Sequence, residues 1–139
     1  MKKRRFMKIA IVVAVLAMVL TQTAFATVWT TNKTFKVPEG QTFVHTIVNT
    51  SDRFTQTKTT NVTTCSVQAS TMTMWTNPFF KMHNKDKSAA GTEVVIKNVD
   101  TPYYATTTIA KNAVAYAAIR SATAQIGDDF IEFKFSADG

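Results

Sequence analysis

The chain has 139 residues, a formal net charge of +7 and one cysteine. Five of its 16 basic residues lie within residues 2–8, so the part after residue 26 carries eleven basic and nine acidic residues, a net charge of +2. This near balance excludes a nucleic-acid-binding function based on charge. The single cysteine excludes an internal disulfide, so the fold must be held by its core alone.

The first 26 residues predict a cleaved, helical secretory signal peptide. A basic stretch at 2–8 precedes an unbroken apolar run at 9–20, and Ala24, Phe25 and Ala26 form an A-x-A cleavage signature. The alternative is an uncleaved membrane anchor, but the apolar run is shorter than the roughly 20 residues that a spanning helix needs. We therefore expect a secreted protein, extracellular or associated with the cell wall, which meets a membrane only through its signal peptide during export. Residues 27–139 then form a single domain.

The composition after residue 26 favours β-structure. This part contains no leucine, and 38 of its 113 residues are Thr, Val or Ile. Such β-branched side chains are stiff at χ1 and fit a pleated surface better than a helix.

Alternation and turn residues divide this part into short extended segments. Pro38, Glu39 and Gly40 form the first turn, and residues 83–91 form the clearest exposed loop. The segment over 79–82 follows Asn77 and Pro78 and is expected as a short edge or corner strand. The predicted extended segments are 29–37, 41–48, a long Thr-rich stretch over 54–70, 79–82, 92–99, 103–109, 113–120 and 130–135.

Two segments do not follow a simple strand pattern. Cys65, Val67 and Ala69 alternate with polar residues, but the apolar positions change parity at Met72 and Met74, which predicts a bulge or tight turn near 69–71. The six alanines of 113–125 would suit a helix, but the alternation of Val114 and Tyr116 with alanines favours a strand over 113–120. The resulting fold is an antiparallel β-sandwich, or a small barrel, of seven to eight strands.

No set of residues forms a recognisable catalytic or cofactor motif, and no motif identifies a particular family. Cys65 would need a nearby base, His45 or His83, to act as a nucleophile, and its flanking residues match no protease signature. We expect Cys65 to be a buried packing residue, with a free thiol or an intermolecular Cys65-linked dimer as alternatives. A metal site would need more ligands than His83 and Asp86 supply, and we expect no metal and no cofactor.

One apolar cluster is the candidate interaction surface, although large apolar residues more often fill a core. It comprises Met72, Met74, Trp75, Phe79, Phe80 and Met82.

The overall organisation is typical of small exported proteins of Gram-positive bacteria. The sequence thus predicts a non-enzymatic secreted protein that binds an unknown protein or cell-envelope partner, at the cell surface or on an external macromolecule. The alternative is a secreted bacteriocin-like antimicrobial protein, favoured by the weak cationic excess and the Met, Trp and Phe cluster.

Overall fold

The computed structural model describes residues 27–37, 44–45, 54–74, 76–121 and 129–139. The predicted signal peptide at 1–26 lies outside these residues, as do most of the predicted strand at 41–48 and Trp75. All regular structure in the described residues is β-strand, which confirms the all-β prediction. None of these residues belongs to a helix that is long and apolar enough to cross a membrane.

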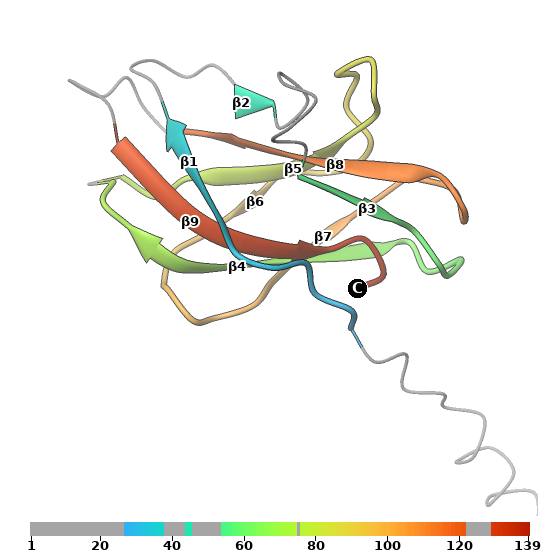
Figure 1. Cartoon of the computed structure of the whole chain (residues 1–139), viewed down its shortest axis with the longest axis horizontal. Helices are drawn as coiled ribbons and strands as arrows, with labels where there is room; N and C mark the ends of the chain where they lie inside the picture. The colour runs from blue at the N-terminus through green and yellow to red at the C-terminus, as the bar shows by residue number, and fades with distance from the viewer. Residues whose placement is uncertain (1–26, 38–43, 46–53, 75, 122–128) are drawn as a thin grey trace, which may run out of the picture.

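The strands form two antiparallel sheets that face each other (Figure 1). The four-stranded sheet has the order β1-β9-β4-β7, with β1 at Lys33–Val37, β4 at Thr64–Met72, β7 at Tyr103–Thr106 and β9 at Asp129–Ser136. The five-stranded sheet contains β2 at Val44–His45, β3 at Thr55–Thr57, β5 at Phe79–His83, β6 at Val94–Val95 and β8 at Val114–Arg120. Both β2 and β3 pair with the same side of β8, so this sheet is four strands wide.

Aromatic rings fill the space between the sheets. Ile131, Phe133 and Phe135 alternate along β9 and are fully buried, as their spacing predicts. Phe80 of the opposite sheet reaches both rings, at centroid distances of 6.3 Å to Phe133 and 6.4 Å to Phe135. Phe54 lies nearer still, 5.1 Å from Phe133 and 4.9 Å from Phe135. The part of the chain after residue 26, which lacks leucine, therefore fills its β-sandwich core largely with phenylalanine.

The predicted bulge and the predicted strand at 113–120 are both confirmed. The register of β4 against β9 shifts between Ala69 and Thr71, which returns Met72 to the core side, opposite Ile131. The segment 113–120 forms β8, which runs through the middle of its sheet. Its residues 115–119 are all buried, so small alanine side chains suit a strand that is covered on both faces.

Two details of the prediction are wrong. The Thr-rich stretch over 54–70 is not one strand: β3 and β4 lie in different sheets, and the chain crosses between them at 58–63. The segment at 79–82 is not an edge or corner strand, because β5 lies between β8 and β6. Pro78 precedes that strand, where it costs no ladder hydrogen bond, and its carbonyl accepts from the N–H of Ile96 at 2.9 Å. The described residues hold nine strands, but β2 and β3 share one side of β8, so each sheet is four strands wide, in agreement with the expected seven to eight strands.

Candidate interaction surface

The predicted apolar cluster does not lie on one face of the molecule. Phe80 and Met82 are fully buried in the core, while Met72 and Met74 are half-buried and pack against it. Phe79 is half-buried beneath the Arg120 guanidinium, which lies 4.1 Å from its ring centroid. Trp75 lies outside the described residues. The described side chains of this cluster therefore lie in three places: within the core, at its margin, and beneath Arg120.

Cys65 is a buried thiol that bonds to backbone. Its side chain is fully buried, and its Sγ donates to the carbonyls of Ala105 at 3.5 Å and Thr106 at 3.8 Å. Burial raises the pKa of the Cys65 thiol to about 12, although the charge of Lys58 opposes the shift. A protonated thiol is a poor nucleophile at neutral pH, so this position is suited to packing.

The polar residues of the predicted loop at 83–91 form a turn, and residues 84–89 are exposed, but His83 is a buried residue of β5 and Ala90 is buried as well. Asp86 accepts from the N–H and the hydroxyl of Ser88, at 3.0 and 2.6 Å, and these hydrogen bonds lower the pKa of its carboxyl. The Nδ1 of His83 lies 2.7 Å from the Lys87 carbonyl. Within the described part of the chain, no three His, Cys, Asp or Glu residues come together in a group that could hold a metal ion.

Glu93 forms ion pairs with two basic side chains of the five-stranded sheet. Glu93 accepts from Arg120 at 2.6 Å and lies 3.6 Å from the Nζ of Lys81. Partial burial would raise the pKa of Glu93, but the hydrogen bond and charge of Arg120, aided by Lys81, hold it below the usual value. These charges satisfy one another, so we assign the group a structural role.

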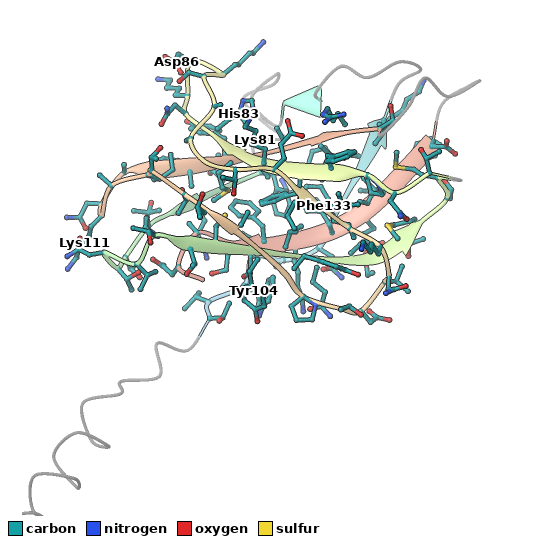
Figure 2. The ribbon with its side chains drawn as sticks, turned by 180° about the vertical axis from the view of Figure 1, so that it is seen from behind. Lys81, His83, Asp86, Tyr104, Lys111 and Phe133 are labelled. Carbon is teal, nitrogen blue, oxygen red and sulfur yellow. The ribbon has the colours of Figure 1, made fainter. Side chains whose placement is uncertain are left out.

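The outer face of the four-stranded sheet carries the exposed aromatic rings. Tyr104 of β7 is 60% exposed and Phe130 of β9 is 47% exposed. Figure 2 shows Tyr104 on the outside of the sandwich, whereas Phe133 lies between the two sheets. Register places Tyr104 opposite Ser66 and Ser66 opposite Ser136, with Phe130 opposite Lys36 at the far end of β9. Strand pairing and alternation place these side chains on the outer side of the sheet: Thr34, Lys36, Thr64, Ser66, Gln68, Thr71, Tyr104, Thr106, Phe130, Glu132, Lys134 and Ser136. Of these, Ser66 and Ser136 are fully buried.

Trp29 extends this outer face beside β9. The N–H of Thr30 donates to the Phe135 carbonyl at 2.9 Å, and the Thr30 hydroxyl accepts from the Phe135 N–H at 3.0 Å. The Trp29 ring then lies 5.1 Å from the Nζ of Lys134, in cation–π range. Sequence reasoning assigned Trp29 only to a strand. Its contact with Lys134 depends on how residues far apart in the chain are paired.

Comparison with known proteins gives no match: no family model, no curated protein and no solved structure is similar to this chain. Function must therefore be inferred from the surface itself.

Proposed function

We propose that this protein is a secreted, non-enzymatic binding protein that contacts an external macromolecule through the outer face of its four-stranded sheet. The observation that carries the proposal is the exposure of Tyr104 and Phe130 on one regular sheet, with polar side chains between them. An exposed ring is a common anchor in recognition, because it buries a large area at a small cost in side-chain entropy. Export is supported by the basic, apolar and A-x-A segments of the first 26 residues.

The spacing of the rings favours an extended partner. Phe130 lies six residues along β9 from Ser136, which is about 20 Å at the rise of a β-strand. Tyr104 stands two strands away from Ser136, a further distance of about 10 Å. Partly exposed polar side chains such as Gln68, Glu132 and Lys134 lie in the gap, whereas Ser66 and Ser136 there are fully buried. The rings therefore do not form the contiguous apolar core typical of protein interfaces. A polysaccharide chain of the cell envelope fits this pattern, because its sugars offer apolar C–H faces to rings and hydroxyls to polar side chains.

Binding to insoluble cell-wall material tests the proposal. Tyr104→Ala and Phe130→Ala should each weaken binding about fivefold or more, because each removes an exposed ring worth more than about 1 kcal/mol at a contact. Val99→Ala is the matched control, since Val99 is an exposed apolar residue outside the four-stranded sheet. Equal binding by all three variants would exclude this face as the contact surface. Killing of related bacteria by micromolar protein, retained in both ring variants, would instead support the antimicrobial alternative.

A further inference from the structure

Lys58 is a buried amine at the point where the chain leaves β3. Its side chain is 1% exposed, and its backbone is held by hydrogen bonds to Ala113 at 2.9 Å and Asn112 at 2.7 Å. Lysine is almost never fully buried without a partner. The groups around Nζ therefore decide its chemical state.

Asp138 presents its carboxyl group to this amine. It stands two residues beyond the end of β9, and its Oδ1 lies 3.9 Å from Lys58 Nζ. Thr59 and Thr60 each donate a backbone N–H and a hydroxyl to this carboxyl, over distances of 2.8–3.2 Å. Nζ itself donates to the carbonyl of Ala137. Figure 1 shows the end of the chain returning beside the connection between β3 and β4.

The hydrogen-bond partners around Nζ do not match an ammonium. An ammonium has three N–H donors, but the described residues offer it one acceptor in hydrogen-bond range, the Ala137 carbonyl. The Asp138 oxygen at 3.9 Å is beyond that range. A secondary amide has one N–H, which the Ala137 carbonyl would accept, and one oxygen, which would keep the donors that now reach one of the two carboxyl oxygens. The contacts of Nζ therefore fit an amide better than an ammonium.

We propose that Lys58 Nζ and Asp138 Cγ form an intramolecular amide bond. A proton first passes from the ammonium to the carboxylate, leaving an amine and a carboxylic acid. The Nζ lone pair then attacks Cγ, and the N–H and O–H donors of Thr59 and Thr60 stabilise the oxyanion that develops. The intermediate loses one carboxyl oxygen together with two protons as water, so a C–N bond forms, a C–O bond breaks, and no oxidant or reductant is needed.

The charges around the pair bear on the first step. Burial lowers the pKa of Lys58, against the opposing charge of Asp138, which favours the amine. Burial would raise the pKa of Asp138, but the hydrogen bonds from Thr59 and Thr60 outweigh it and lower that pKa. The ion pair and the neutral pair contain the same number of protons, so the fraction of the reactive form does not depend on pH between the two pKa values. A poorly solvated site shifts that internal equilibrium toward the neutral pair.

The amide would be a covalent cross-link in a chain that cannot form an internal disulfide, because it has one cysteine. It would link the end of β3, in the five-stranded sheet, to the residues after β9, in the four-stranded sheet. A covalent link that closes so long a loop restricts the conformations of the unfolded chain, and this stabilises the folded state. This proposal does not depend on the proposed function, because it concerns a link within the chain and not a contact with a partner.

The mass of the intact, denatured protein tests the proposal. The purified protein should weigh less than its sequence by one water molecule, and fragmentation should identify a linked pair of peptides containing Lys58 and Asp138. Lys58→Arg and Asp138→Ala should each have the full mass of their own sequences. Lys81→Arg is the matched control, because Lys81 also faces a carboxylate, that of Glu93 at 3.6 Å, but is partly exposed; it should keep the loss of water.

If a variant fails to fold, the mass of the wild-type protein alone tests whether the amide between Lys58 and Asp138 forms. A wild-type protein that has its full mass after refolding and prolonged incubation at neutral and mildly acidic pH would overturn the proposal. Linked peptides that contain other residues would overturn it as well.

Discussion

At the scale of single residues, Cys65 gives the simplest test of how tightly the sandwich is closed. Its thiol is fully buried, and burial raises its pKa to about 12, so it should react with aromatic disulfide reagents only when the protein opens. We expect no labelling of the native protein on the timescale of minutes and complete labelling in denaturant. Fast labelling of the native protein, or a dimer on non-reducing gels that is absent from Cys65→Ser, would contradict this placement.

Glu93 should contribute stability that depends on pH. Its pKa is held below the usual value of 4.5, so its folded form binds protons less readily than its unfolded form. The stabilisation is therefore present above pH 4.5 and is lost as the pH falls through the folded-state pKa. For a partly exposed ion pair it should amount to about 0.5 kcal/mol, after allowance for solvent screening. Glu93→Gln should reduce the free energy of unfolding by that amount at neutral pH and by less in acid, as measured by urea denaturation. An equal loss at both pH values would contradict the assignment.

At the scale of the strands, β8 can be tested through its alanines. Ala117 is fully buried, faces the core and lies opposite Met82. Ala117→Leu should lower the free energy of unfolding by about 1–3 kcal/mol, because the packed interior has no room for the added atoms. Val114→Leu, at an exposed position of the same strand, should change it by less than about 0.5 kcal/mol. Similar small effects from both substitutions in urea denaturation would show that β8 is not enclosed as described.

The same strands show what could be predicted from the sequence. The alternation in β9 and the parity change in β4 are local patterns, so they identified the buried residues and the bulge near Ala69. The position of a strand within its sheet depends on distant segments, and this is why β5 was expected at an edge although β6 and β8 flank it. Nothing local marks the change of sheet after β3, since threonine is common on both sides of it.

The sequence contains a local signal for part of the candidate surface but none for the Lys58 site. Phe130 shares the parity of Glu132 and Lys134, a signal that it points outward. Tyr103 and Tyr104 are neighbouring tyrosines that point to opposite faces of a strand, so residue type does not show which of them is exposed. The approach of Asp138 to Lys58 joins two segments from opposite parts of the described chain, through contacts that no spacing in the sequence encodes.

At the scale of the whole molecule, the two sheets should unfold together because they share one aromatic core. Phe80 is the ring of the five-stranded sheet that meets both Phe133 and Phe135 of the other sheet. Phe80→Ala should cost about 3–5 kcal/mol, since it removes a fully buried ring and leaves a cavity. That is a large part of the roughly 5–15 kcal/mol that holds a typical domain folded.

The measurement is urea denaturation of Phe80→Ala followed by far-ultraviolet circular dichroism and by aromatic fluorescence. Both signals should change at one lowered urea concentration, as expected for a two-state transition. Phe130→Ala is the control, because that ring is 47% exposed and its loss should have little effect on stability. Two separate transitions in either protein would mean that each sheet has a core of its own, and the sandwich described above would then be wrong.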